Sequence, residues 1–483
     1  MSDSTTAPNN APNDLPPIEQ ELYKKREKIY PREVHGIFAV LRNLAMAALL
    51  GLYYGLAWID WNGHQAVLFD LPARKFYIFG FTFWPQDFFF LALLLIIAAL
   101  SLFFFTTLAG RLWCGYACPQ TVWTEMYMLL ERWIEGDRKA RMKLDKGPKD
   151  FRRLRIKVTK QVVWILFSLW TGFTFVGYFT PIKELWVHLV TWNLGPWETF
   201  WIFFYGFATY GNAGFMREQV CIYMCPYARF QSAMFDKNTL IISYDEKRGD
   251  PRGSRKRGMA SADVGLGDCI DCKLCVQVCP VGIDIRDGFQ MECIGCGACI
   301  DACDDIMDKM RYPRGLIRYA TQNGMAGHLS GASMLQRVWR PRTLLYGAAL
   351  LAGVSAFAWS LASRPPFRVD VIRDRGVMAR LADDGGIDNV YRLFVMNSAE
   401  DAHDYQIDVS GTHGVYGLRV DEGQQLTLGP MESRQMTLRI HLSPETAANL
   451  VGQVVPIQIG IEQTGRPGES VRVMEKSTFI VPR

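Results

Sequence analysis

The sequence contains the run Cys269-Ile-Asp-Cys272-Lys-Leu-Cys275-Val-Gln-Val-Cys279-Pro280, followed by Cys293-Ile-Gly-Cys296-Gly-Ala-Cys299-Ile-Asp-Ala-Cys303. These two runs hold eight of the twelve cysteines of a 483-residue chain. Their spacing is typical of a domain with two 4Fe-4S clusters, in which the fourth cysteine of each run ligates the other cluster. We therefore expect one cluster on Cys269, Cys272, Cys275 and Cys303, and a second on Cys279, Cys293, Cys296 and Cys299. A zinc site is a much weaker interpretation, because zinc motifs normally stop at paired C-x-x-C units.

The other four cysteines form a second, repeated motif. It reads Cys114-x-x-x-Cys118-Pro119 and Cys221-x-x-x-Cys225-Pro226, and each copy follows the end of an apolar run. Cysteines four residues apart lie on one face of a helix, so two neighbouring helices would bring four thiols together. The repeat therefore predicts a second site, and we expect its cysteines to bind a metal and to act in catalysis.

The ligand of this second site is left open by the residues alone. A pocket of four soft thiolates suits Cu(I), zinc or another iron-sulfur cluster. Because Cys275-x-x-x-Cys279-Pro280 has the same local pattern, a third cluster is a serious rival to copper. A redox-active dithiol pair and buried structural cysteines are the remaining interpretations.

Five apolar stretches are long enough to cross a bilayer, for which about 20 residues are needed. They are residues 37–59, 88–109, 162–179, 198–215 and 342–362. The fourth stretch is the weakest, because it contains two tyrosines, an asparagine and three glycines. We expect that stretch to face other helices rather than lipid.

Positive charge predicts the orientation of these spans. Residues 132–160 contain twelve Lys and Arg, whereas the loop at 181–197 has only Lys183. The N-terminus and the segment 217–341 are therefore expected in the cytoplasm, and the C-terminus in the periplasm of a bacterial inner membrane. The basic residues lie beside apolar runs, which argues for membrane lipid as a partner and against nucleic acid.

The expected domain order follows from these features. Residues 1–30 are predicted to be a disordered cytoplasmic tail, 31–235 a membrane domain with four spans, and 236–341 a cytoplasmic ferredoxin domain. The fifth span at 342–362 leads into residues 363–483, where apolar and polar residues alternate in short runs separated by turn residues. That pattern predicts an immunoglobulin-like β-sandwich. The fold class is thus a multi-domain membrane protein with five spans, a bacterial two-cluster ferredoxin-like domain and a C-terminal immunoglobulin-like domain.

The combination of five spans, two C-x-x-x-C-P motifs, a two-cluster ferredoxin insert and this C-terminal domain resembles the CcoG/FixG/RdxA family. The resemblance covers nearly the whole chain from about residue 30. Members of that family are accessory proteins of the cbb(3)-type cytochrome c oxidase of bacteria. The membrane portion also resembles the polyferredoxin-type membrane proteins of nitrate and nitrous oxide respiration, which lack this C-terminal domain.

The resemblance implies a cupric reductase that turns Cu(II) into Cu(I) for oxidase assembly. The expected partners are oxidase subunits or copper chaperones and transporters, together with an unidentified electron donor. By this carry-over Cys114, Cys118, Cys221 and Cys225 contact copper, and the eight ferredoxin cysteines carry electrons. One alternative is an electron-transfer subunit between quinol or a soluble donor and a membrane enzyme. Another is a non-enzymatic, copper-binding assembly factor.

Overall fold

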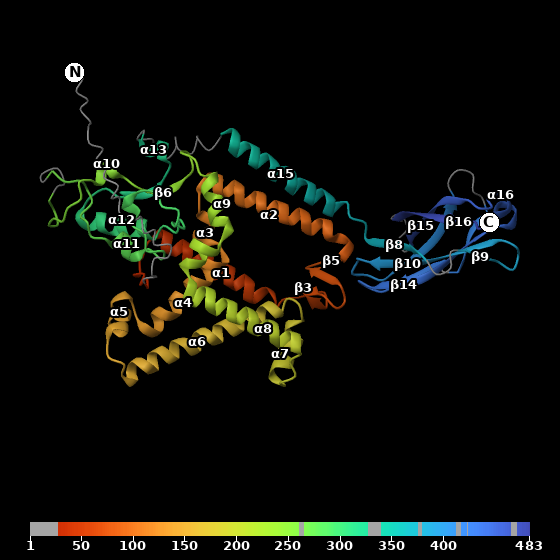
Figure 1. Ribbon diagram of the computed structural model, residues 1–483, viewed down its shortest axis with the longest axis horizontal. Coiled ribbons are helices and arrows are strands. Elements are labelled where there is room, and N and C mark those ends of the chain that lie inside the picture. The colour runs from red at the N-terminus through yellow and green to blue at the C-terminus, as the bar shows by residue number, and fades with distance from the viewer. Residues whose placement is uncertain are drawn as a thin grey trace, which may run out of the picture.

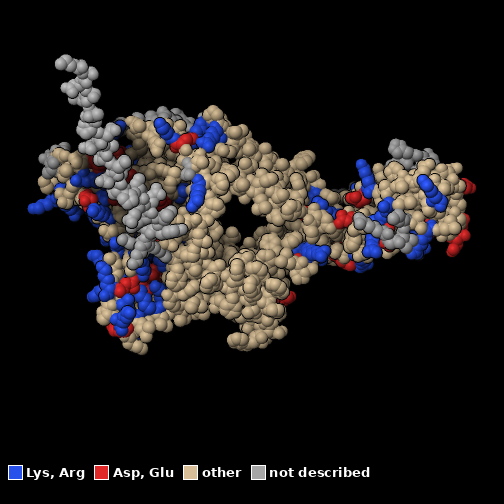
Figure 2. Space-filling model, in the orientation of Figure 1, with Lys and Arg blue, Asp and Glu red and all other residues tan. Residues whose placement is uncertain are grey.

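The computed structural model describes residues 28–259, 265–326, 340–374, 379–411, 417–422, 424–464 and 471–483. Almost all of the predicted disordered tail lies outside these residues. Figure 1 shows an elongated molecule, with the cysteine-rich domain at one end, a β-sandwich at the other and a set of long helices between them. Charged side chains gather at the two ends in Figure 2, and a broad band of other residues separates them.

Three helices in this band are long and apolar enough to cross a membrane. They are α1 (Ile37–Leu56), α2 (Phe88–Ala109) and α15 (Pro341–Ala362). Residues 85–109 reach a mean hydropathy of 3.0. α2 and α15 lie side by side, with the rings of Phe90 and Phe357 6.0 Å apart. The large apolar side chains that α1, α2 and α15 leave exposed are those expected to contact lipid.

The third and fourth predicted spans coincide with two further helices. These are α6 (Phe151–Val176) and α8 (Pro196–Thr209), and α8 continues as the π-helical segment η2 (Tyr210–Met216). α6 and α8 pack closely, since a Cβ added to Gly172 would lie 2.2 Å from the carbonyl oxygen of Ile202. By length and composition only three helices of the described residues qualify as spans, so the crossing of α6 and α8 stays a prediction.

Short elements connect the helices at both ends. Toward the β-sandwich lie β1 (Asp60–Trp61), β2 (His64–Gln65), β3 (Val67–Asp70), β4 (Lys75–Ile78), β5 (Phe81–Phe83), η1 (Pro85–Asp87) and α7 (Ile182–Val190). Toward the cysteine-rich domain lie α3 (Leu112–Tyr116), α4 (Pro119–Glu135), α5 (Arg138–Lys146), η3 (Val220–Met224) and α9 (Pro226–Met234). The second group surrounds the repeated cysteine motif.

The cysteine-rich domain is built on one antiparallel strand pair, β6 (Ile241–Tyr244) and β7 (Ile317–Ala320). Its other elements are α10 (Glu246–Gly249), α11 (Leu274–Val278), η5 (Ile285–Asp287), α12 (Ala298–Met310) and α13 (Gln322–Ala326). The core contains Ile242, Met307 and Ile317 together with several of the cysteines. α12 also contacts the membrane region, because the Asp301 carboxylate accepts hydrogen bonds from the backbone N–H groups of Phe38 and Ala39 at the start of α1.

The C-terminal domain is a sandwich of two antiparallel sheets, as predicted. One sheet has β8 (Phe367–Arg373), β9 (Arg380–Leu381), β10 (Ile387–Asn397), β12 (Leu418–Glu422) and β14 (Ser433–Leu442). The other has β11 (His403–Gly411), β13 (Gln425–Leu428), β15 (Val454–Thr464) and β16 (Arg472–Ile480), and the short helix α16 (Pro444–Asn449) follows β14. Alternate residues point inward, so that Tyr391, Leu393 and Val395 of β10 are fully buried.

Ion pairs attach this domain to the helical region. The Asp87 carboxylate, which is 1% exposed, lies 2.6 Å from the guanidinium of Arg364 and 2.7 Å from that of Arg368. Arg364 follows α15 and Arg368 is on β8, whereas Asp87 directly precedes α2. The sandwich is therefore joined both to the end of α15, which leads into it, and to the start of α2.

Candidate functional site

Two cavities in the cysteine-rich domain separate the eight cysteines into the two predicted ligand groups. The first is a small cavity lined by Cys269, Cys272, Cys275 and Cys303. The second is of similar size and is lined by Cys279, Cys293, Cys296 and Cys299, and also by Cys275. Four soft thiol donors around each cavity fit a 4Fe-4S cluster. Because Cys275 lines both cavities, the two sites share a wall, which gives electrons a short path between them.

Local backbone geometry explains how the loops surround these cavities. Gly295 and Gly297 have φ values of 68° and 75°, in the left-handed region that favours glycine. A Cβ on Gly297 would also lie 2.6 Å from the ring of Phe38, so this loop needs glycine for two reasons. The C-x-x-C-x-x-C spacing and the glycines were both readable from the sequence.

Burial raises the pKa of five cluster thiols, those of Cys275, Cys279, Cys293, Cys299 and Cys303. For Cys303, burial and then the neighbouring Cys275 and Cys269 raise the pKa to about 12, and the pKa of Cys293 is also raised to about 12. These thiols are therefore protonated at neutral pH when no metal is bound. Cluster binding must supply the positive charge that turns them into thiolates.

The acidic residues of this domain are largely paired. Arg286 lies 2.6 Å from both Asp271 and Asp284, and Arg248 lies 2.6 Å from Asp268. An excess of negative charge near a cluster would disfavour the addition of an electron and so lower its potential. Much of that charge is neutralised locally, and the effect on potential stays a prediction.

The repeated motif does bring its four cysteines together, but not on helix faces. Cys114 is on α3 and Cys221 on η3, whereas Cys118 and Cys225 are the N-cap residues of α4 and α9. The expectation that each pair shares one helical face is wrong, because the residue before a proline is disfavoured in the helical region and the chain turns there. Each second cysteine instead stands at a helix N-terminus. Burial raises the pKa of Cys118, and the backbone N–H groups of Thr121 and Gln120 offset part of that rise.

The four thiols of the repeated motif lie close enough together to shift one another's pKa. Burial raises the pKa of Cys221 to about 12, and nearby Cys118, Cys114 and Cys225 add to the increase. We call Cys114, Cys118, Cys221 and Cys225 the four-thiol site. The fully buried amide of Gln231 forms a hydrogen bond of about 3.5 Å with the Cys114 sulfur.

The four-thiol site is wider than a site for one tetrahedral ion. Among the described residues, Asp388, Asp421 and His441 form the one group whose ligand atoms all lie within 4.8 Å of one another. No three of the four sulfur atoms meet that limit, whereas thiolates bound to one ion at about 2.3 Å would lie roughly 3.8 Å apart. A single ion would be held by two thiols, or the site would contract around it.

α3 connects the four-thiol site to the second cluster cavity. A Cβ added to Gly115 would lie 2.9 Å from the carbonyl oxygens of both Gly295 and Ile294, so two backbones touch here. The Tyr116 hydroxyl donates to the Cys296 carbonyl at 3.3 Å. Cys114 packs in the same core as Cys279 and Cys296. The two sites are therefore direct neighbours, which no local sequence pattern indicated.

Two arginines near the four-thiol site are buried inside the protein. Arg111, 7% exposed, donates from Nη2 to the Ala228 carbonyl at 2.7 Å, and its charge acts on Cys114 and Cys293. Arg217, 9% exposed, pairs with Glu131 at 3.0 Å. Arg111 thus lies between the four-thiol site and the second cluster cavity.

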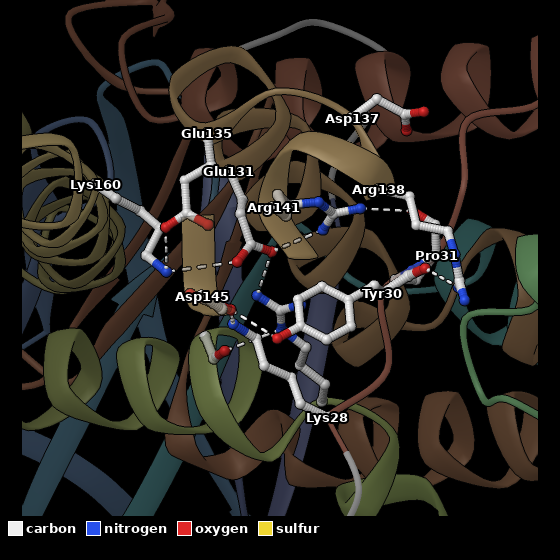
Figure 3. A network of polar contacts seen from close by, with 12 residues as sticks. Lys28, Tyr30, Pro31, Glu131, Glu135, Asp137, Arg138, Arg141, Asp145 and Lys160 are labelled. Atoms are coloured by element: carbon white, nitrogen blue, oxygen red, sulfur yellow. Dashed lines mark hydrogen bonds and ion pairs between the residues drawn. The ribbon is translucent and has the colours of Figure 1, made fainter. Parts of the chain in front are cut away.

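A buried ion-pair network lies beside this junction, and the sequence reasoning missed it. Figure 3 shows Glu131 and Glu135 of α4 facing Lys160 and Arg141. Glu131 is 1% exposed, and although burial alone would raise its pKa, Arg217, Lys160 and Arg141 lower it to about 2. The basic stretch 132–160 was interpreted as a topology signal that faces lipid, with a docking surface for a partner as the alternative. The sequence did contain an indication of this network, because α4 places acidic residues among the apolar residues of its buried face.

The fold and the site together define a class: a multi-helix membrane protein that carries a two-cluster ferredoxin domain at one end and an immunoglobulin-like domain at the other. Residues 216–322 match the family profile of the 4Fe-4S dicluster domain, and residues 91–137 match that of a 4Fe-4S binding domain. Residues 357–482 match the immunoglobulin-like fold at the C-terminal of FixG, in a description that also names an oxidoreductase.

Three relatives match along most of the chain. The nitrogen fixation protein FixG of Rhizobium meliloti is 38% identical over 461 residues, which cover 88% of each chain. Protein RdxA of Cereibacter sphaeroides is 39% identical over 474 residues, covering 96% of this chain and 99% of the relative. Protein RdxB of the same organism is 44% identical over 398 residues, covering 80% and 83%. The chain belongs to the FixG/RdxA/RdxB family, and the predicted membership is confirmed.

Proposed function

We propose that this iron-sulfur protein of the membrane reduces Cu(II) to Cu(I) at the four-thiol site. One observation supports the proposal above all others. The backbone of α3, which holds Cys114, packs against the loop that holds Cys296, so an electron at the second cluster is next to the thiols. The twelve cysteines then form one route: two clusters in sequence, followed by an acceptor site.

The number of electrons that each cluster releases matches the number that Cu(II) takes. Reduction of Cu(II) takes one electron, and each 4Fe-4S cluster stores and releases one electron at a time. Thiolates prefer Cu(I), so the four-thiol site would stabilise the product. The residues of this chain bind the ion, keep it beside the second cluster and exclude bulk water through the burial of Gln231 and Arg111.

The proposed orientation places the clusters in the cytoplasm and the β-sandwich in the periplasm of a bacterial inner membrane. The basic residues of 132–160 lie at the cluster end of the helices, and Figure 2 shows that end rich in Lys and Arg. The orientation is the same with three spans or five, because both numbers are odd. Phe200, Phe204 and Phe207 of α8 are at least half exposed, which supports a lipid-facing fourth span.

The destination of Cu(I) is also a proposal. We infer that it serves assembly of a cbb(3)-type oxidase, through oxidase subunits or copper chaperones. The relatives are named for nitrogen fixation or as Rdx proteins, and those names do not identify the recipient. The β-sandwich, joined to α2 through Asp87, is the part of the chain best placed to meet a periplasmic partner.

A specific observation favours a second candidate, a third 4Fe-4S cluster at the four-thiol site. All twelve cysteines fall within the segments 91–137 and 216–322, which match 4Fe-4S profiles. The wide separation of the sulfur atoms also suits a cluster better than one ion. The chain would then be an electron-transfer subunit that passes electrons to another membrane enzyme.

The experiment that tests the proposal follows Cu(I) formation by anaerobic protein. The clusters are reduced with dithionite, the excess is removed, and Cu(II) is added with a Cu(I)-specific chelator as the readout. Wild-type protein is expected to form Cu(I), and a Cys118→Ser/Cys225→Ser variant to keep its iron but lose the reaction. Equal rates in the two proteins would show that copper is not reduced at these thiols.

A further inference from the structure

A cavity of about 340 Å³ touches both redox sites. Cys221 of the four-thiol site and Cys296 of the second cluster cavity both line it. Its other walls come from α1, α4, α6 and η2, at the cluster end of the long helices. The volume is within the range of small-molecule sites, roughly 300–1,000 Å³. Neither cluster ligation nor copper binding uses this space.

The lining combines apolar side chains with four cations and three acids, each of which has a partner. Arg42 pairs with Glu125 at 3.4 Å, and Glu131 pairs with Arg217 at 3.0 Å and with Lys160 at 3.4 Å. The apolar part of the wall includes Met128, Trp164, Phe215, Val281 and Ile294. A hydrated cation would gain little among paired charges and apolar side chains. A neutral, largely apolar molecule suits this lining.

Two lining residues carry buried N–H groups that have no acceptor among the described residues. These are Nε of Arg42 and Nε1 of Trp164, and Trp164 is only 2% exposed. Buried donors without a partner are rare in folded proteins and call for an explanation such as a ligand or water. Gln161 uses its side-chain carbonyl to accept from the Tyr210 hydroxyl at 2.8 Å, which leaves its NH₂ group as a further donor. A ligand with acceptor oxygens would give these donors the hydrogen-bond partners that they lack.

One wall of the cavity is formed by the segment that precedes α1. Lys28, Ile29 and Pro31 line it there. Figure 3 shows this segment fixed to α5: Lys28 pairs with Asp145 at 2.6 Å, and Arg141 donates to the Pro31 carbonyl at 2.5 Å. The Tyr30 hydroxyl also donates to Asp145 at 2.7 Å. The cavity is therefore walled on this side, and its other walls include α1, one of the helices long and apolar enough to span a membrane.

We propose that this cavity binds a lipid-soluble hydroquinone, and that this molecule is the electron donor of the chain. The inference rests on the proposed electron-transfer function and names its donor class. The hydroquinone loses two electrons and two protons and leaves as the quinone. The electrons go singly to the two 4Fe-4S clusters, and the protons go to Glu125 and then to water. The oxygens of the ring meet the donors of Arg42 and Trp164.

The test uses the full-length holoprotein in lipid nanodiscs without copper. Binding of a short-chain quinone is measured by isothermal titration, and bleaching of the cluster absorbance is followed after addition of the matching quinol. Trp164→Phe removes one donor, Thr124→Leu fills space in the cavity, and Trp133→Phe is the matched control, since Trp133 is 70% exposed. Reduced flavin mononucleotide serves as a water-soluble donor for comparison.

We expect quinone to bind the wild type and the control equally. Trp164→Phe should bind it about tenfold more weakly, as for one lost buried hydrogen bond. Thr124→Leu should weaken binding by about the same factor, because the larger side chain occupies space that the ring needs. Quinol should bleach the clusters in the wild type and the control, and about tenfold more slowly in the cavity variants. Unchanged quinone affinity in both cavity variants would overturn the site. Binding without bleaching, or bleaching by the flavin alone, would overturn the donor role. Dithionite bypasses the cavity, so failure here leaves the copper test intact.

Discussion

The contact between α3 and the second cluster loop gives the sharpest perturbation of the proposed route. In a Gly115→Ala variant the new Cβ would lie 2.9 Å from the carbonyl oxygens of Gly295 and Ile294 and 3.0 Å from the Cα of Cys296. All three are backbone atoms, so no side chain can rotate away. Ordinary carbon contacts are about 3.5–4.0 Å, so the two backbones must separate by roughly 0.5–1 Å. The expected cost of this overpacking is about 1–3 kcal/mol.

The assay combines stability with electron transfer. We expect the Gly115→Ala protein to keep its iron, to lose its cluster absorbance at a lower temperature, and to transfer electrons to Cu(II) more slowly after dithionite reduction. Gly51→Ala is the matched control, because a Cβ on Gly51 meets no atom within 4 Å. A melting temperature and a reduction rate equal to those of the control would refute the reasoning that this contact joins the two sites.

Three further predictions concern the buried charges. Glu131→Gln should destabilise the membrane region by about 3–5 kcal/mol in chemical unfolding, because Arg217, Lys160 and Arg141 lose their common partner; a loss below 1 kcal/mol would contradict this. The lowered pKa of Glu131 means that its contribution is complete above its ordinary value of 4.5 and is lost only as the pH falls toward about 2, so the difference in stability between wild type and Glu131→Gln should be constant from pH 8 to pH 5. A difference that already shrinks between pH 7 and pH 5 would show that the carboxylate is not held by its cations. Asp87→Asn should loosen the β-sandwich and increase hydrogen exchange around Arg364, while the iron content stays unchanged; unaltered exchange would show that these ion pairs do not attach the domain.

Much of the architecture could be predicted from local patterns. Cysteine spacing alone sorted eight residues into two ligand groups, and the two cavities contain those groups. Period-two alternation predicted the β-sandwich, since β10, β11, β14 and β15 all lie within residues 363–483, where apolar and polar residues alternate. Both patterns are local, because each is imposed by neighbouring residues along the chain.

Long-range packing could not be predicted from these local patterns. The closeness of Gly115 to Gly295 joins residues 180 positions apart, and nothing near either glycine indicates the other. The charges at 132–160 were assigned to topology because a sequence does not show which cations meet a buried carboxylate. The break at Cys118-Pro119 could have been foreseen, because proline restricts the residue before it. The prediction that each cysteine pair shares one helical face used only the four-residue spacing of the cysteines and did not take the proline into account.

The central claim is that eight cysteines hold clusters and four receive electrons. Iron analysis of anaerobically purified protein tests it most directly, with wild type and Cys118→Ser/Cys225→Ser measured side by side. The account predicts about eight iron atoms per chain in both proteins, as for two 4Fe-4S clusters. About twelve in the wild type, falling to about eight in the variant, would contradict it and assign a third cluster to the four-thiol site.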